Sequence, residues 1–368
     1  MISQSRFSDC INMFKINRRL STSSCKNSSR IDICGHELEA VKDIPHGAKV
    51  FIGGFGSCGV PESLINGLIQ KNSKNLTVVS NNAGTDTYGV GLLLKNRQIR
   101  RLILSFTGPN KEYDRQFANG ELEVELIPQG TLIEKLRAGG AGIPAFYTRT
   151  GYGTMVQHGG LPIKFENDRK TVSLISESRE HRRFEIGDCI LEKSIVGDFS
   201  LIKAWKADRD GNLTFRPKKL HRKTARNFNV AMCHAAKTTI VEVDEIVDVG
   251  QLDPESVHVP GIYVDRIVKA SGHQRCLIPN RQMSVGGDSV RVNLGIGIPL
   301  LCAQFIPKDV RVFLHGENGL VGVGPYPDMD HIDPDIVNAG GESVTIVPGG
   351  AYQTSEESFA MIRGYDIL

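Results

Sequence analysis

Residues 311–327 read Arg311-Val-Phe-Leu-His-Gly-Glu-Asn-Gly-Leu-Val-Gly-Val-Gly-Pro-Tyr-Pro327, an apolar run that ends in a stretch rich in glycine. The apolar run at 310–314 predicts a buried strand, and His315-Gly-Glu-Asn-Gly319 predicts a sharp turn at its end. Further glycines and prolines predict a loop after the turn; the glycines are Gly322 and Gly324. The turn follows the carboxyl end of the strand, where open α/β sheets place their ligands.

The residues alone leave two interpretations of Glu317 open. Most glutamates are surface acids in loops, and Glu317 could be one of them. Its flanks, Gly316 and Gly319, leave steric room around it, so its carboxylate could also attack an acyl group as a nucleophile.

The same order of strands and turns occurs twice along the chain. In each half a strand runs into a Gly-x-Pro turn, a second strand ends at asparagine and glycine, and a third ends at Pro-x-Gly. The first copy comprises Lys49–Ile52, Leu76–Val79 and Leu122–Leu126, and the second comprises Val292–Pro299, Val312–Leu314 and Val344–Val347. We predict an α/β fold of two related open α/β units whose strand ends face each other.

The repeat predicts where the units begin and end. Residues 36–270 form the first unit, 271–290 a linker rich in glycine and proline, and 291–368 the second unit. The second copy lacks the later strands of the first, so we expect the second unit to be incomplete.

The first thirty or so residues differ in composition from the rest of the chain. Basic residues and serines dominate them, and Asp9 is their single acid; the basic residues are Arg6, Lys15, Arg18, Arg19, Lys26 and Arg30. This composition is typical of a mitochondrial targeting segment, which we place at 1–35, although a disordered tail has a similar composition.

Composition also bounds the function classes. A net charge of +3 does not indicate a nucleic-acid partner, and the basic stretch Arg216–Arg226 is predicted to be a solvated loop. No apolar run approaches the roughly 20 residues that cross a bilayer, so no membrane role is expected. The 8 cysteines form no C-x-x-C pair, and no metal site is predicted.

Gly54, Gly56 and Gly59 match the G-x-G-x-x-G dinucleotide fingerprint after a strand. The fingerprint also expects an acid about 20 residues later, at the end of the next strand. Asn81 and Asn82 occupy that place. A nicotinamide-dependent oxidoreductase is therefore the least favoured alternative, and we expect the glycines to approach a ligand or the facing unit.

Four amides are candidate site residues. Asn81 and Asn82 match the position of Glu317 in the first half, Gln129 lies in the predicted Pro128-Gln-Gly130 turn, and Asn293 ends a strand. Each could contact a substrate or could simply satisfy the backbone of its own turn.

Taken together, these stretches resemble the mitochondrial succinyl-CoA:3-ketoacid CoA-transferases, which are family I CoA-transferases. The matching segments include Gly53-Gly-Phe-Gly-Ser-Cys-Gly-Val-Pro-Glu62, Val79–Gly84, Pro128–Leu132, Arg137–Tyr147, Lys203–Arg209, Asn293–Leu301, Glu317-Asn-Gly319, Gly322–Pro327 and Glu357–Arg363. The resemblance extends from about residue 37 to residue 364.

The resemblance implies a ping-pong transfer of CoA from succinyl-CoA to acetoacetate or a similar short 3-oxoacid. Glu317 attacks the thioester to give a mixed anhydride, and CoA thiolate then converts this anhydride into a glutamyl-CoA thioester. Gln129, Asn81, Asn82 and Asn293 line the site and can donate to oxyanions, and the glycine-rich loops lie near it.

The resemblance further implies a homodimer in the mitochondrial matrix, with CoA thioester as substrate and no cofactor or metal. The family has serine at the position of Gly316, and its pattern continues beyond Gly364. We therefore keep one alternative, a catalytically incomplete truncated product or fragment of this family.

Overall fold

The computed structural model describes residues 31–215, 226–272 and 290–364, apart from 295–298, 300–301, 306–311, 329–331, 333–335 and 339–341. The predicted targeting segment up to Arg30, the basic loop up to residue 225 and most of the linker lie outside the described residues. Residues 310–311 of the predicted strand also lie outside them.

A parallel sheet forms the centre of the first unit. Its strands are β1 (Asp32–Cys34), β2 (Lys49–Ile52), β3 (Leu76–Ser80), β4 (Ile99–Leu104), β5 (Glu123–Leu126), β11 (Gly197–Asp208), β12 (Leu213–Thr214), β13 (Ala236–Val247) and β14 (Arg266–Lys269). Their order is β1-β14-β13-β11-β2-β3-β4-β5, with β12 antiparallel beside β11 and all other neighbours parallel. The α/β prediction is confirmed.

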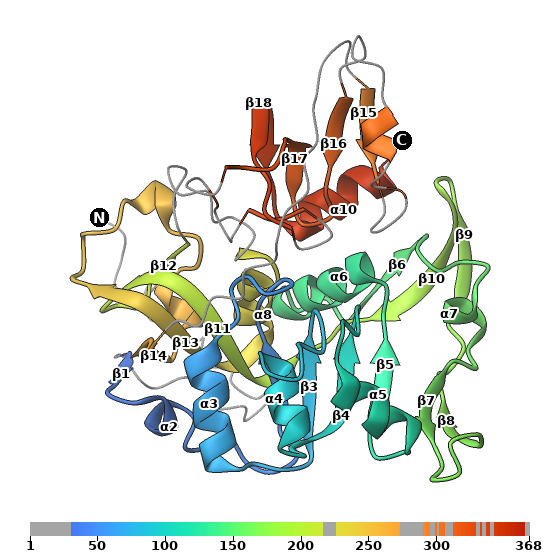
Figure 1. Ribbon diagram of the computed structural model, residues 1–368, viewed down its shortest axis with the longest axis horizontal. Helices are drawn as coiled ribbons and strands as arrows, with labels where there is room; N and C mark the ends of the chain where they lie inside the picture. Colours follow the sequence, from blue (N-terminus) through green and yellow to red (C-terminus); the bar gives the residue numbers. More distant parts are fainter. Residues whose placement is uncertain are drawn as a thin grey trace, which may run out of the picture. The chain divides into compact units, whose positions relative to one another are not determined.

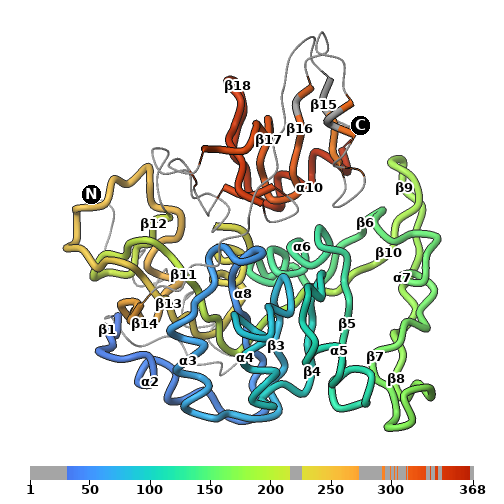
Figure 2. The backbone as a smooth tube through the Cα atoms, in the orientation of Figure 1, coloured from blue at the N-terminus to red at the C-terminus, as the bar shows by residue number. Residues whose placement is uncertain are grey.

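The sheet reverses its direction of growth beside β2. The chain adds β3, β4 and β5 on one side of β2, then returns to place β11, β13 and β14 on the other side, as the colour sequence in Figure 2 shows. Ligands of open α/β sheets bind at such a switch point, beyond the carboxyl ends of the strands. The glycine-rich stretch Gly53–Gly59 follows β2 at this position.

Helices cover both faces of this sheet. They are α2 (Glu37–Ala40), α3 (Glu62–Lys71), α4 (Val90–Lys95), α5 (Lys111–Ala118), α6 (Gln129–Gly140) and α8 (Asn229–Ala235), with short 3-10 turns η4 (Pro254–Ser256) and η5 (Gly261–Tyr263) before β14. Helices α3, α4 and α5 lie side by side (Figure 1), and Leu64 and Leu93 pack with Val50 and Leu102 of the sheet. Helix α8 contacts β2, β11 and β13, and α6 packs on α8.

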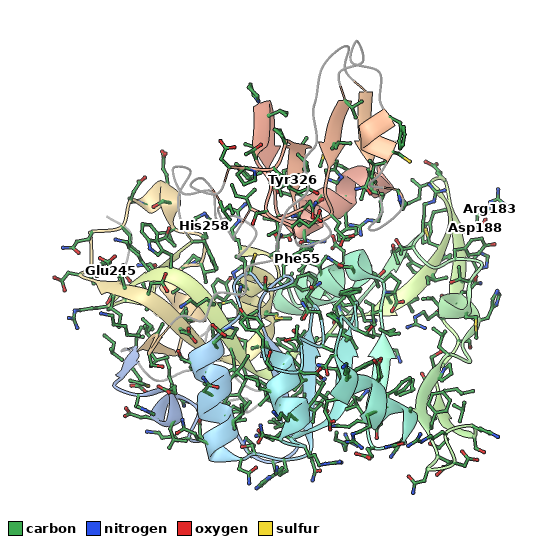
Figure 3. All side chains as sticks on the ribbon, in the orientation of Figure 1. Phe55, Arg183, Asp188, Glu245, His258 and Tyr326 are labelled. Carbon is green, nitrogen blue, oxygen red and sulfur yellow. The ribbon has the colours of Figure 1, made fainter. Side chains whose placement is uncertain are left out.

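An antiparallel excursion separates α6 from β11. It contains β6 (Ala145–Thr148), α7 (Met155–His158), β7 (Pro162–Phe165), β8 (Val172–Ile175), β9 (His181–Phe184) and β10 (Gly187–Lys193). Figure 3 labels Arg183 of β9 and Asp188 of β10 on it. Glu192 of β10, 1% exposed, joins this excursion to α6 through an ion pair with Lys135 at 2.5 Å. It also pairs with Arg179, within the excursion itself, at 2.6 Å.

The described part of the second unit starts like the first and then departs from it. It consists of β15 (Val290–Asn293), η6 (Cys302–Phe305), β16 (Val312–His315), β17 (Leu320–Val323), β18 (Ile346–Tyr352) and α10 (Ser355–Arg363). β15 and β16 are parallel neighbours, as β2 and β3 are, so the repeat is confirmed for these two strands. β17 and β18 are added antiparallel.

Several predictions for the second unit are wrong in detail. The predicted loop around Gly322 is strand β17, because the turn at Gly316–Gly319 folds the chain back antiparallel onto β16. The strand predicted at Val344–Val347 starts at Ile346 and continues through Pro348-Gly-Gly350. Beyond Pro299, Phe305 lies in the short 3-10 helix η6 and is 82% exposed.

Details of the first unit also differ from prediction. Strand β1 (Asp32–Cys34) lies before residue 36, where the first unit was predicted to start, and it pairs with β14. Leu126 ends β5 with 49% exposure, and the buried residue is Ile127 just beyond it. Gln129 does not lie in a tight turn but begins α6, after Pro128 at its cap. None of the helices in the described ranges is long and apolar enough to span a membrane.

Candidate active site

Glu317 lies in the turn that joins β16 to β17. The turn is closed by two backbone hydrogen bonds, from Gly316 N to Leu320 O at 2.7 Å and from Gly319 N to Gly316 O at 3.0 Å. Gly319 has a φ of +91°, and a Cβ on it would stand 2.0 Å from Gln353 O. A glycine is required there, as expected for a residue beside a close backbone approach.

His315 anchors the start of this turn. Its Nε2 lies 2.7 Å from Ser358 Oγ, and its Nδ1 lies 3.0 Å from Asn293 Nδ2. Ser358 already donates its single hydroxyl hydrogen to Gly316 O at 2.9 Å, so Nε2–H must donate to Ser358 and Nδ1 must accept from Asn293. His315 is therefore neutral, and its burial lowers its pKa to about 4.

The carboxylate of Glu317 is half-buried and makes no hydrogen bond or ion pair within the described chain. Burial raises its pKa, because desolvation disfavours the charged form. A carboxylate that is desolvated without a compensating partner is a functional candidate, since structural carboxylates are normally paired. Its base strength, and with it its capacity as a nucleophile, is raised by the same desolvation.

Asn227, which was not predicted from the sequence, holds the far side of the turn. It is 1% exposed; its Nδ2 donates to Asn318 O at 2.6 Å, and its Oδ1 accepts from Ser355 N at 3.1 Å. Asn318 is itself buried and donates its side-chain amide to Val337 O. The sequence signal for Asn227 was weak, because it follows the basic stretch and lies 91 residues from Asn318.

The glycine-rich loop after β2 is held by Asn81 and Asn82. Asn81 Oδ1 accepts from Gly56 N at 3.4 Å, and Asn82 Nδ2 donates to Gly56 O at 3.1 Å. Phe55 (Figure 3) forms a two-way bridge with Cys58, so the loop turns back on itself between Gly54 and Gly59. In this structure both amides satisfy the loop backbone.

This loop does not resemble a dinucleotide site. Helix α3 begins at Glu62, after Pro61, and not directly at Gly59. The space between Gly54, Gly56, Asn82 and Gly84 measures only about 10 Å³, which is about one water and far less than a pyrophosphate. The geometry therefore argues against the nicotinamide alternative.

Two segments connect the first unit with the Glu317 turn. Asn229, two residues after Asn227, donates from Nδ2 to Gly59 O at 2.9 Å and so contacts the end of the glycine-rich loop. Gln129 begins α6, whose Gly130 lies against Phe359 of α10. Gln129 Nε2 is buried and has no hydrogen-bond partner among the described residues, so it is a donor available to a ligand.

The remaining candidate glycines shape the strands that support the turn. Gly322 lies at the register shift of β17 against β18, with a φ of +82° typical of a β-bulge residue. A Cβ on Gly324 would stand 2.6 Å from Thr345 Oγ1, and one on Gly316 would stand 2.3 Å from Asn318 Oδ1. Tyr326 (Figure 3) donates to Glu342 at 2.5 Å beyond this bulge.

Other groups in the described chain do not form a competing site. No cluster of three or more metal-ligating side chains occurs among the described residues. A pocket of about 540 Å³ lies beside the antiparallel excursion, and several of its charges pair with one another, for example Arg101 with Glu125 at 2.6 Å.

Comparisons with known proteins agree with this architecture. The family described as Coenzyme A transferase matches residues 38–270 and 287–367. The human protein named succinyl-CoA:3-ketoacid coenzyme A transferase 2, mitochondrial, is 49% identical over 349 residues, covering 89% of this chain. A Bacillus subtilis protein, named as one subunit of a probable succinyl-CoA:3-ketoacid coenzyme A transferase, is 49% identical over 237 residues, covering 64% of this chain and 89% of its own.

Solved structures show the same fold at lower identity. An acyl-CoA transferase of Escherichia coli O157:H7 superposes with a TM-score of 0.68 at 20% identity, over 94% of this chain and 69% of that one. Glutaconate coenzyme A-transferase of Acidaminococcus fermentans gives 0.54 at 18% identity, over 65% of this chain and 75% of that one.

The chain spans 66% of the length of the human relative and of its rat and mouse counterparts. Within that span the match includes both strand-and-turn copies and the turn that carries Glu317. On these grounds the chain belongs to the coenzyme A transferase family.

Proposed function

We propose that this protein transfers CoA from succinyl-CoA to acetoacetate or a similar short 3-oxoacid, with Glu317 as nucleophile. The observation that carries the proposal is the half-buried, unpartnered carboxylate with a raised pKa in the β16–β17 turn. The names of the mammalian relatives supply the substrate class and the mitochondrial location. A homodimer in the mitochondrial matrix completes the proposal.

In the proposed mechanism a carboxylate oxygen of Glu317 attacks the thioester carbonyl, the C–S bond breaks, and CoA leaves as thiolate. The thiolate then attacks the glutamyl carbonyl of the anhydride and releases succinate. The acceptor carboxylate attacks the resulting glutamyl-CoA thioester, and the steps run in reverse. The scheme uses no metal or cofactor.

The mechanism requires hydrogen-bond donors for the oxyanions of the tetrahedral intermediates, two of which form in each half-reaction. One such donor can contribute about 3 kcal/mol of transition-state stabilisation. The free Nε2 of Gln129 has the required chemistry. Asn81, Asn82 and Asn293 act mainly by holding the loop and strand ends in place, since the structure engages their side chains with backbone or with His315.

The proposal is tested by trapping the thioester. Incubation with acetoacetyl-CoA followed by borohydride or hydroxylamine is expected to modify Glu317, as seen by peptide mass spectrometry. Glu317→Gln should abolish the adduct and lower transfer by at least about 1,000-fold. Because the ionised carboxylate attacks, the rate should fall as pH drops through the raised pKa of Glu317.

Glu356 offers a matched control for this experiment. Burial raises its pKa as well, and it lies in the first turn of α10. Glu356→Gln should leave the Glu317 adduct intact. Absence of an adduct on the unsubstituted chain would reject the proposed activity and favour a catalytically incomplete member of the family.

A further inference from the structure

The segment Arg226–Asn229 connects the glycine-rich loop with the turn that carries Glu317. Asn227 reaches the turn through Asn318 O at 2.6 Å and reaches the start of α10 through Ser355 N at 3.1 Å. Asn229 reaches the loop after β2 through Gly59 O at 2.9 Å and also accepts from Lys203 N at 3.1 Å. Two asparagines, two positions apart, therefore fix two separate loops.

The backbone between these asparagines is strained. Phe228 has φ +64° and ψ −36°, a conformation that a bulky residue rarely adopts. Its side chain is 1% exposed, so packing holds it there. Strain of this kind persists only where the surroundings over-determine the conformation, and it clusters at functional sites.

Asn229 is held in place on the side of the first unit by close packing against Gly53. It is 0% exposed, and a Cβ added to Gly53 would stand only 1.9 Å from its Oδ1. Any side chain at position 53 would displace it. The Gly53 backbone therefore provides the close approach that seats Asn229, and Asn229 in turn sets the position of Asn227.

Asn227 differs from the other residues that hydrogen-bond to the Glu317 turn, because it belongs to the first unit. The other hydrogen bonds to the turn within the described chain come from the second unit itself; they are donated by Ser358, Gln353 N and the turn's own amides. Asn227 is the donor that comes from the first unit. It acts on the carbonyl of Asn318, the residue bonded directly to Glu317.

We propose that Asn227 is a positioning residue for the nucleophile. Through the strained Arg226–Asn229 segment, Asn227 fixes the position of the Glu317 turn relative to the glycine-rich loop. This inference rests on the proposed function of Glu317. A small displacement of a reacting group can cost on the order of 100-fold in rate, so a fixed turn has a large effect.

The two polar atoms of the Asn227 amide can be tested separately. Asn227→Asp keeps the acceptor for Ser355 N and nearly the same volume, but removes the donor to Asn318 O. Asn227→Ala removes both. Gln98→Ala is a matched control, because Gln98 is 0% exposed and donates to two backbone carbonyls, Leu68 O and Ser73 O, before β4 at the amino end of the sheet.

The readouts, on the whole 368-residue chain, are Glu317 thioester formation from acetoacetyl-CoA and hydrogen exchange of the amides. We expect Asn227→Asp to slow thioester formation at least about tenfold with KM changed less than about twofold, whereas Gln98→Ala changes the rate less than about twofold. Exchange at 316–320 should accelerate in both Asn227 variants, and exchange of the Ser355 amide should accelerate only in Asn227→Ala.

The inference is overturned if exchange at 316–320 is unchanged in Asn227→Asp, or if Gln98→Ala slows thioester formation equally. If the unsubstituted chain forms no thioester, the proposed function fails, and the exchange comparison still decides whether Asn227 holds the turn.

Discussion

His315 shows how one buried side chain can define the ground state of the site. It is 3% exposed, and its neutral form fits both neighbours, accepting from Asn293 and donating to Ser358. Protonation would add a second N–H to the imidazole ring, at Nδ1, where it would face the amide donor of Asn293. The folded state therefore requires the neutral imidazole, and lowering the pH should reduce the free energy of unfolding.

The first prediction concerns the pH dependence of stability at His315. Its pKa is about 4 in the folded chain and 6.5 ordinarily, so the unfolded chain binds the proton more tightly. Its contribution to the free energy of unfolding is complete above pH 6.5 and is lost as pH falls toward 4, by up to about 3 kcal/mol. Denaturant titrations across this window measure it.

His315→Gln keeps a donor for Ser358 and removes the titration, so the variant should lose less stability between pH 6.5 and 4. His158→Gln, at an exposed histidine, is the control and should retain the full slope. Equal slopes in both variants would contradict the prediction.

At this scale the sequence predicted the nucleophile candidate but not its environment. Glu317 could be predicted because strand, glycine and turn are all local signals. The contacts of Asn227 with Asn318 and Ser355 span 91 and 128 residues, and the His315–Ser358 contact spans 43. No local pattern encodes such pairs. Asn81 and Asn82, for which the sequence left a substrate contact and a backbone role both open, hydrogen-bond the neighbouring glycine-rich loop in this structure.

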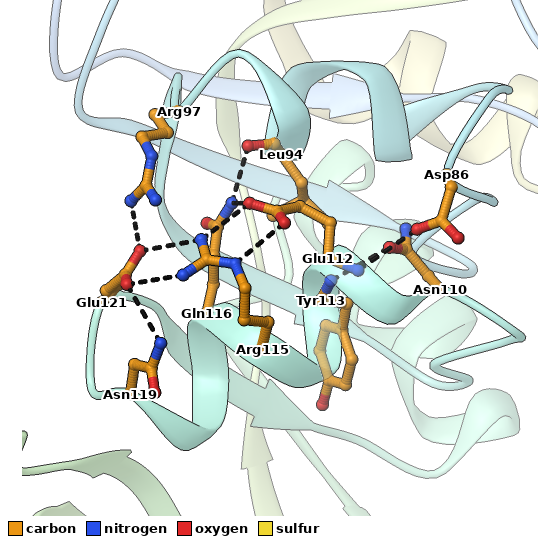
Figure 4. A network of polar contacts seen from close by, with 10 residues as sticks. All are labelled: Asp86, Leu94, Arg97, Asn110, Glu112, Tyr113, Arg115, Gln116, Asn119 and Glu121. Atoms are coloured by element: carbon orange, nitrogen blue, oxygen red, sulfur yellow. Dashed lines mark hydrogen bonds and ion pairs between the residues drawn. The ribbon is translucent and has the colours of Figure 1, made fainter.

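Among the elements, α5 shows which polar contacts determine a helix position. Figure 4 shows Arg115 between Glu112 and Glu121, with Asn110 at the start of the helix. Asn110 Oδ1 accepts from Tyr113 N at 3.0 Å and its Nδ2 donates to Ala83 O at 2.9 Å. Ala83 lies between Asn82 and Gly84, so this cap also orders the loop after β3.

The second prediction compares these contacts. Asn110→Ala should lower the free energy of unfolding by about 2–3 kcal/mol, because it removes an N-cap and leaves the buried carbonyl of Ala83 unpaired. Arg115→Ala should have a clearly smaller effect, since Arg115, Glu112 and Glu121 are all partly exposed and water screens their ion pairs. Urea unfolding measures both. A larger loss for Arg115→Ala would contradict this ranking.

Prediction of elements succeeded where periodicity was strong and failed at glycine-rich strands. Strands β2 and β3 follow clear apolar patterns and were confirmed. β17 and β18 contain Gly322 and Pro348-Gly-Gly350, which locally predict loops. Pairing with neighbouring strands overrode that local preference, and the bulge at Gly322 accommodates it.

For the whole molecule, the repeat predicted two related units but not the contacts between them. α10 packs on α6 and carries Ser358, which holds both His315 and Gly316 O. Arg363 also pairs with Glu134 of α6 at 2.9 Å. The packing of α10 on α6 should therefore affect the position of the Glu317 turn. The sequence pattern did not predict this dependence.

The third prediction tests this dependence at Gly130. A Cβ there would stand 2.8 Å from the ring of Phe359, so Gly130→Ala forces α10 away from α6. Overpacking of this kind typically costs about 1–3 kcal/mol, although alanine in a helix recovers up to about 1 kcal/mol. In a Phe359→Ala background the two ring contacts are removed and only the contact with the Cβ of residue 359, at 3.1 Å, remains, so the same change should cost clearly less. The double-mutant cycle should give a coupling energy of at least about 1 kcal/mol in the free energy of unfolding, and Gly130→Ala should also slow Glu317 thioester formation. If Gly130→Ala has the same effect in both backgrounds, the packing of α10 on α6 does not carry the coupling.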